Sequence, residues 1–307
     1  MKRLCTAALL FIAFSLNSQD VNKHPNKGEP PILGPHWARG AHKASPARSN
    51  DLIYHSGPIL PGASVQAIFW GSSWGTSPGD KIKGMNAFYE GEGGTKYAAT
   101  VDEYSGKGQQ VGSSLTYLGT ITDTTSAPQN PSPSQVLAEV CRRIANPQPD
   151  GYYPVYLDHK RKGNSCAYHS WGTCGGVEVQ FGFFWNLDGD AGCDPQSTVS
   201  GESQGLQALA NVSGHELSET RSDPQGNAWY AASGEENADE CAWTFGGAYV
   251  DFNNTLYPHW KIQGNWSNKA NDGTSLNGPG YTTPQNGFGV AGTGCVDGTN
   301  YPGPITK

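Results

Sequence analysis

Six cysteines after residue 140 constrain this chain more than any other feature of its sequence. They lie at positions 141, 166, 174, 193, 241 and 295, and a seventh, Cys5, lies near the N-terminus. In an exported chain an even number of cysteines indicates disulfides, here up to three, with 15 possible pairings. Thiolate ligation of a metal is less favoured, because the sequence contains no C-x-x-C motif.

The first 19 residues predict export. Met1-Lys2-Arg3 is basic, Leu4–Leu16 is almost wholly apolar and Asn17-Ser18-Gln19 is polar, which is the pattern of a secretory signal peptide cleaved near Ser18. The alternative, an N-terminal anchor, is disfavoured because a membrane-spanning helix needs roughly 20 apolar residues. We therefore expect a secreted protein, extracellular or periplasmic. Its predicted disulfides are Cys241–Cys295, Cys166–Cys193 and Cys141–Cys174.

Composition narrows the classes of partner. The formal net charge of −7 and the isoelectric point near 5.6 provide no basic patch, so neither nucleic acid nor a membrane is expected as a partner. The 41 glycines, 14 tyrosines and 9 tryptophans are typical of a loop-rich secreted fold that is stiffened by aromatic packing and crosslinks. We expect a monomer.

The distribution of apolar residues predicts a single α+β domain over residues 51–307. Residues 20–50 are rich in Pro, Gly and Lys without an apolar period, which indicates a disordered linker or a pro-segment. A mixed sheet should pack on two or three helices. Strands are predicted at 65–70, which is a buried apolar run, at 114–121, which alternates, and at 152–157 and 177–185, which are apolar-aromatic runs. Helices are predicted at 80–103 (in two pieces), from Ser132 or Ser134 to 144, and at 200–220.

The last of these helices carries the residues most suited to chemistry, His215-Glu216-Leu217-Ser218-Glu219. Positions i and i+4 share a helix face, so His215 and Glu219 can bind one ion, while Glu216 can reach a metal-bound water as general base. This is the H-E-x-x-H pattern with a carboxylate in place of the second histidine. Zn²⁺ is the expected ion, with Mn²⁺ or another divalent ion as the alternative. The competing interpretation is a solvated helix face.

An acidic run follows the helix and could supply a third ligand. Glu236 and Asp239 are three residues apart and would share a face of a helical turn. One of them could complete the metal shell, and the other could hold the free ring nitrogen of His215. A solvated acidic loop is the alternative, which a disulfide at Cys241 would disfavour. His169, in a predicted loop, could lie near the metal or stabilise an oxyanion, but a structural role beside a disulfide is favoured.

Several motifs together resemble a known family. The chain is similar, over most of residues 52–297, to secreted microbial relatives of the EXORDIUM (phosphate-induced protein 1) family. One departure is Ser56, where the family usually has glycine. The matching segments are Tyr54–Pro58, Ile68–Gly71, Cys166–Ser170, Asp188–Asp194, Gly214–Glu219, Ser222–Pro224, Asn227–Tyr230, Gly234–Cys241 and Gln263–Asn268.

The resemblance implies two functions of different classes. The strand, metal-binding helix and following acidic ligand are similar to zincin peptidases, which predicts a zincin-like endopeptidase acting on polypeptide, with the strand at 177–185 pairing with substrate. In the alternative, a non-catalytic secreted protein of the EXORDIUM type binds a cell-wall component or glycan. Glu216 separates the two, because only a hydrolytic site needs an acid beside the ligands.

Overall fold

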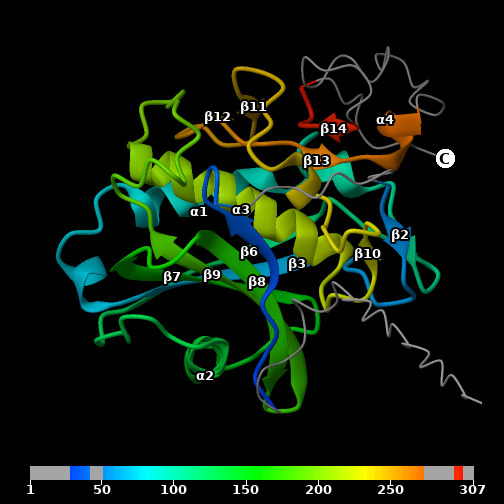
Figure 1. Cartoon of the computed structure of the whole chain (residues 1–307). Coiled ribbons are helices and arrows are strands. Elements are labelled where there is room, and N and C mark those ends of the chain that lie inside the picture. Colours follow the sequence, from blue (N-terminus) through cyan, green and yellow to red (C-terminus); the bar gives the residue numbers. More distant parts are fainter. Residues whose placement is uncertain (1–27, 42–50, 273–293, 300–307) are drawn as a thin grey trace, which may run out of the picture.

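The computed structural model describes residues 28–41, 51–272 and 294–299 (Figure 1). The predicted signal peptide lies outside these residues, as do parts of the predicted linker. Within the described residues, a six-stranded mixed sheet and four α-helices form an α+β fold, as expected. None of the helices in these ranges is long and apolar enough to cross a membrane.

The sheet has the strand order β1-β8-β9-β7-β3-β6. β3, β6, β7 and β9 run parallel, whereas β8 is antiparallel to β9, and β1 is antiparallel to β8. The predicted strands at 65–70, 152–157 and 177–185 are confirmed as β3, β7 and β9, whose apolar runs fit parallel strands covered on both faces. The predicted alternating strand at 114–121 is confirmed as β6, which lies at the sheet edge and is mostly partly exposed. The bounds are β1 Leu33–Trp37, β3 Ala63–Trp70, β6 Leu115–Asp123, β7 Gly151–Lys160, β8 Ser165–Cys174 and β9 Val177–Asn186.

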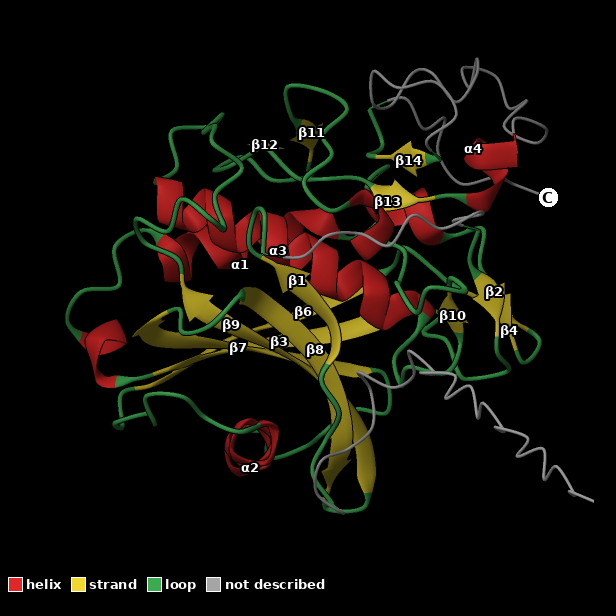
Figure 2. Cartoon of the chain, in the orientation of Figure 1, coloured by secondary structure: helices red, strands yellow, loops and turns green. Residues whose placement is uncertain are grey.

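The helices cover both faces of this sheet (Figure 2). α1 (Lys81–Glu92) and α3 (Gln204–Ser222) lie together on one face, and α2 (Pro133–Arg143) lies on the other. α2 begins with a capping box at Ser132. α4 (Asn268–Asp272) is a short helix near the C-terminus.

α3 is the most buried element of the fold. Ser203 caps it by accepting a hydrogen bond from Leu206 N at 3.2 Å, and it ends at Asp223, before Pro224. Every residue from Gly205 to Ser222 is buried, because the sheet covers one side and the C-terminal segments cover the other (Figure 2). Polar side chains on this helix are therefore held away from water, and the prediction of a possible solvated face is wrong.

Short strand pairs and 3₁₀ turns complete the fold. They are β2 (Ile53–Tyr54) with β10 (Trp229–Tyr230), β4 (Ser105–Gly106) with β5 (Gln109–Gln110), β11 (Val250–Asp251) with β12 (His259–Trp260), β13 (Asn265–Trp266) with β14 (Cys295–Val296), and the turns η1 (Ser72–Gly75), η2 (Ala98–Val101) and η3 (Asp239–Cys241).

Three sequence predictions about this region of the sheet are wrong. Residues 33–37 were expected in a disordered linker, yet they form β1, the outermost strand beside β8. The strand at 177–185 was expected at the sheet edge, yet β9 is interior, because β8 and β1 both lie outside it. The segment around His169, expected as loop, is β8 itself.

All three predicted disulfides are present. Cys141–Cys174 joins α2 to β8, Cys166–Cys193 joins β8 to the loop after β9, and Cys241–Cys295 joins η3 to β14. Three disulfides in the described residues are consistent with an oxidising environment. Removing Cys241–Cys295, which spans 54 residues, should lower the free energy of unfolding by about 4 kcal/mol in the chain-entropy model.

The test replaces both cysteines of that pair by serine and measures chemical denaturation. The matched control replaces Cys141 and Cys174, which span 33 residues. Its loss should be similar, because the entropic effect depends only on the logarithm of loop length. An unchanged denaturation midpoint in either double variant would contradict the assignment of that disulfide.

Ser56 marks a strained backbone position. Its φ is +73°, in the left-handed region that costs a non-glycine residue about 1 kcal/mol. This is the position at which the resembled family usually has glycine. Ser56→Gly should therefore raise the free energy of unfolding by about 1 kcal/mol, whereas Ser56→Ala, which keeps the Cβ, should not. Equal effects of the two substitutions in denaturant titrations would refute the strain.

Candidate metal centre

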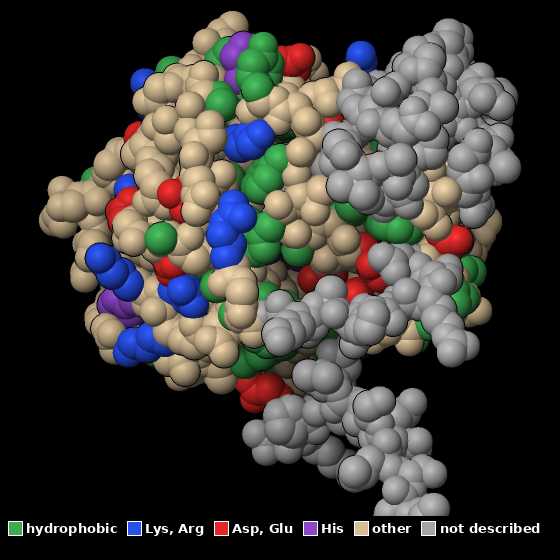
Figure 3. Space-filling model, turned by 45° about the horizontal axis from the view of Figure 1, so that its top comes forward, with side chains coloured by type: hydrophobic (Ala, Val, Ile, Leu, Met, Phe, Trp, Pro, Cys, Tyr) green, Lys and Arg blue, Asp and Glu red, His purple; other side chains and the backbone are tan. Residues whose placement is uncertain are grey.

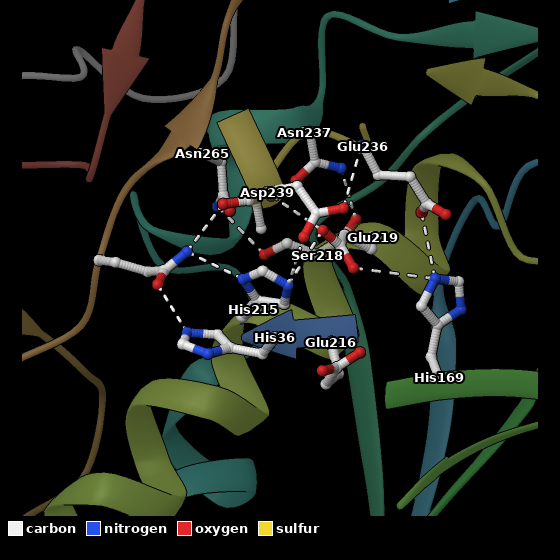
Figure 4. A network of polar contacts seen from close by, with 12 residues as sticks. His36, His169, His215, Glu216, Ser218, Glu219, Glu236, Asn237, Asp239 and Asn265 are labelled. Atoms are coloured by element: carbon white, nitrogen blue, oxygen red, sulfur yellow. Dashed lines mark hydrogen bonds and ion pairs between the residues drawn. The ribbon is translucent and has the colours of Figure 1, made fainter. Parts of the chain in front are cut away.

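α3 presents the three motif residues in a fully buried environment. His215, Glu216 and Glu219 each have 0% exposed surface. His215 Nε2 lies 3.1 Å from Glu219 Oε1, as expected for positions i and i+4 on one helix face (Figure 4). The motif therefore brings an imidazole and a carboxylate together inside the protein.

The acidic loop after α3 is held against the helix by its own polar groups. Asp223 accepts hydrogen bonds from Asn227 N at 2.6 Å and Ala228 N at 2.7 Å, which shapes the turn out of the helix. Asn237 Nδ2 then donates to Ser218 O at 3.1 Å. The predicted alternative of a solvated loop is wrong, because this segment lies packed on α3.

Glu236 and Asp239 both reach the motif, but from different sides. Asp239 N donates to Glu219 Oε1 at 3.0 Å, and Asp239 Oδ1 lies 3.6 Å from His215 Nε2. Glu236 Oε2 lies 3.1 Å from His169 Nε2 instead. Asp239 is thus the acid beside His215, and Glu236 is the acid beside the second histidine.

His169 belongs to this cluster, which the sequence interpretation of a structural histidine beside a disulfide did not predict. It projects from β8 with 0% exposure, and its Nε2 lies 3.8 Å from Glu219 Oε2. Figure 4 shows Glu219 between the rings of His169 and His215. The ligand atoms of His169, Glu219 and Glu236 all lie within 4.8 Å of one another, as do those of His215, Glu216 and Glu219.

Gln263, not an acid, holds the second nitrogen of His215. Its Oε1 accepts from Trp243 N at 3.2 Å, and its Nε2 donates to Ala238 O at 2.8 Å. These two backbone contacts fix the orientation of the amide. Gln263 Nε2, which also lies 2.9 Å from His215 Nδ1, is therefore a donor toward that nitrogen. The prediction that Glu236 or Asp239 holds this nitrogen is therefore wrong.

His36, from β1, closes the other side of Gln263. Its Nε2 lies 2.8 Å from Gln263 Oε1, and its ring centroid lies 4.3 Å from that of His215. Sequence reasoning missed both His36 and Gln263. Gln263 opens one of the matching family segments, and that was the only available signal.

Burial dominates the electrostatics of the cluster. Desolvation, reinforced by neighbouring carboxylates, raises the pKa of Glu216, Glu219 and Asp239 well above the usual range. Desolvation raises the pKa of Glu236 in the same way. It also lowers the pKa of His169 and His36 to about 4. In the described part of the chain no Lys or Arg forms an ion pair with these acids: the nearby Arg221 bonds Glu92 at 2.6 and 2.8 Å.

The donor set fits a divalent cation. His215 Nε2 and Glu219 Oε2 are buried and lack a hydrogen-bond partner, and buried polar atoms normally have one. Imidazole nitrogen and carboxylate oxygen are ligands that Zn²⁺ and Mn²⁺ both accept. An ion beside Glu219 would satisfy both atoms and offset the buried charge.

Glu216 differs from the other acids in its surroundings. Both of its oxygens lack a hydrogen-bond partner of normal geometry, and it stands apart from the dashed contacts of Figure 4. The backbone N–H groups of His36 and His169 lower its pKa, but burial outweighs them. Its position next to the ligand atoms suits a base as well as it suits a ligand.

Comparison with known proteins adds no assignment. No protein-family model matches the chain, and no match was found among curated proteins or solved structures. The resemblance to the EXORDIUM family therefore stays a prediction, and the argument for function comes from the geometry of the site.

Proposed function

We propose that this protein is a secreted metal-dependent hydrolase, and in its most specific form a zincin-like endopeptidase. The observation that carries the proposal is the buried cluster around Glu219, in which two histidines and three further acids converge without Lys or Arg. Burying unpaired carboxylates is costly by several kcal/mol each. A bound cation would offset that cost.

The order of elements supports the zincin-like form of the proposal. β9 directly precedes α3, and the acidic segment ending in η3 directly follows it. This repeats the expected layout of a strand, a metal-binding helix and an acidic ligand. In the layout, His215 and Glu219 hold the ion, with Asp239 as third ligand, since it is the acid of the following loop that lies nearest His215.

Metal ligation sets the tautomer of His215. A ligating Nε2 leaves the ring proton on Nδ1, where Gln263 now places an N–H donor. Turning the amide of Gln263 over, so that its oxygen accepts from Nδ1, would break its hydrogen bonds with Trp243 N and Ala238 O, so these groups must shift with it in the metal-bound state. Gln263 acts as a positioning residue, because the partner of the second nitrogen orients a ligating histidine.

Glu216 is assigned the role of general base. The ion, when bound, supplies Lewis-acid polarisation and lowers the pKa of water toward neutrality. Glu216 accepts a proton from a water molecule in the site as that water attacks a carbonyl, and then gives the proton to the leaving amine. Its burial and raised pKa favour a carboxyl group that can hold a proton between the two steps.

The rival proposal, a glycan-binding protein, has less support. Sugar stacking needs exposed aromatic faces, yet in residues 28–41, 51–272 and 294–299 the only well-exposed aromatic side chain is Tyr249, at 41%. The face shown in Figure 3 carries Lys and Arg scattered among uncharged side chains, so it offers no gathered basic surface for nucleic acid either.

Two adjacent substitutions separate catalysis from structure. Glu216→Gln keeps shape but removes the base, so metal content and melting temperature should stay near wild type. Hydrolysis of a denatured protein substrate should fall by about two to four orders of magnitude. His215→Ala removes a ligand, so metal content and melting temperature should fall together.

Metal analysis, thermal melting and a proteolysis assay on the two variants decide the assignment. If Glu216→Gln loses as much metal as His215→Ala, Glu216 is a ligand and not the base. If neither variant changes metal, stability or hydrolysis, the hydrolase proposal is wrong and the glycan-binding proposal replaces it.

A further inference from the structure

Glu219 turns its two oxygens toward two different histidines. Oε1 lies 3.1 Å from His215 Nε2, and Oε2 lies 3.8 Å from His169 Nε2 (Figure 4). Each histidine also has an acid of its own: Asp239 lies 3.6 Å from His215, and Glu236 lies 3.1 Å from His169. The cluster is therefore built as two half-sites that share one carboxylate.

The ligand atoms of the two half-sites fall into two separate groups, His169, Glu219 and Glu236 in one and His215, Glu216 and Glu219 in the other. Ligand atoms bound at about 2.1 Å lie at most about 4.2 Å apart across one ion. The atoms of each group lie within 4.8 Å of one another, and both groups contain Glu219, but His169 and His215 belong to different groups. Two ions satisfy this arrangement without moving either histidine.

The charge of the cluster also indicates two ions. Glu216, Glu219, Glu236 and Asp239 carry four negative charges when ionised, and their partners in the described ion pairs are histidines only. One divalent ion leaves two negative charges buried, whereas two divalent ions leave none. Uncompensated buried charge is strongly unfavourable, so the fully ionised cluster calls for a second ion.

We propose that the protein holds two divalent cations, Zn²⁺ or Mn²⁺, bridged by Glu219. His215 and Asp239 complete the first half-site, and His169 and Glu236 complete the second. The first half-site rests on the proposed function, and the second goes beyond it. Paired ions in hydrolases are typically about 3.5–4 Å apart and clamp a reacting oxygen from both sides, which suits hydrolysis of an amide or ester.

The test measures metal content of the full chain after saturation with Zn²⁺ and dialysis, and electron paramagnetic resonance after loading with Mn²⁺. Wild type should hold two ions per chain, with an exchange-coupled Mn²⁺ signal. His169→Ala and His215→Ala should each retain one ion and lose the coupling, and Glu219→Gln should weaken both sites. His259→Ala removes a surface histidine paired with Asp251 and should change nothing.

The possible failures are distinguishable. One ion in wild type, lost in His215→Ala but kept in His169→Ala, would refute the second half-site and leave the proposed function standing. One ion lost in either histidine variant would mean that both histidines serve a single rearranged site, which also refutes the bridge. No ion in wild type would overturn both proposals.

A separate observation concerns β1, which covers the cluster. β1 pairs with the outer edge of β8, with Leu33 opposite His169 and His36 opposite Ala167. A Cβ on Gly34 would lie 1.8 Å from Glu219 Oε2, so the backbone of β1 touches the shared carboxylate. The N–H of His36 is one of the backbone groups that lower the pKa of Glu216.

Side chains of β1 seal the cluster on the same side. The His36 ring packs edge-on against Trp243, with centroids 4.6 Å apart, and Trp243 Nε1 donates to Trp37 O at 2.9 Å. With β1 in place, Glu216 and Glu219 are inaccessible. β1 therefore closes the cluster at the edge of β8.

We also infer that β1 is an inhibitory strand that occupies the docking edge for an extended peptide. β8 would pair with such a peptide through its backbone, as sheet edges do in strand addition. The inference rests on the position of β1. Among its tests, only a measurement of hydrolysis depends on the proposed function.

Gly34→Val tests the inhibitory strand, because its side chain has no room beside Glu219 and must push β1 off β8. The full-length variant should stay folded, its β8 amides should exchange faster with solvent, and it should bind a labelled peptide of residues 31–39 that wild type does not bind. Gly40→Val is the control: its φ of +73° is positive, like the +44° of Gly34, but a Cβ there has nothing within 4 Å.

Cooperative unfolding of Gly34→Val, with Gly40→Val folded, would show that β1 is an integral strand and would overturn the inference. A folded Gly34→Val protein that binds no peptide would overturn it as well. Peptide binding without hydrolysis would support the docking edge while counting against the proposed function.

Discussion

Four carboxylates buried together, with no Lys or Arg paired to them in the described residues, are the constraint on which this structure depends. Burial raises the pKa of all four acids and so favours their protonated forms. Bound cations would offset the same buried charge and release those protons. Stability, metal binding and protonation at this centre would then be a single coupled equilibrium, with Glu219 at its middle.

The fold is organised to keep that centre dry and rigid. α3 is covered on every side, so it brings the motif into the interior. Asn237 attaches the acidic loop to the end of α3, and the disulfide Cys241–Cys295 holds the loop from the other side. β8 and β1 close the remaining side, with glycine at position 34 because no side chain fits against Glu219.

Much of this architecture could be predicted from local sequence patterns. The buried parallel strands were predictable from continuous apolar runs, and α3 from its apolar period and the Asp223-Pro224 stop. β8 was missed because Ser165–Cys174 mixes small, polar and aromatic residues without an apolar run. β1 was missed because Gly34-Pro35 is typical of a turn, and its strand conformation comes from pairing with residues 128 to 136 positions away.

The candidate site was also predictable only in part. His215, Glu216 and Glu219 follow from helix periodicity, and the acidic loop from its proximity to the helix. His36, His169 and Gln263 are isolated polar residues that lie far from the motif in the sequence. Only tertiary packing brings them to it. The central claim, that this cluster holds metal, is tested most directly by anomalous diffraction at the zinc edge from crystals of the zinc-loaded full chain. The account predicts anomalous density within bonding distance of Glu219 and His215; crystals with no such density, and with Glu219 sharing a proton with a neighbouring acid, would contradict it.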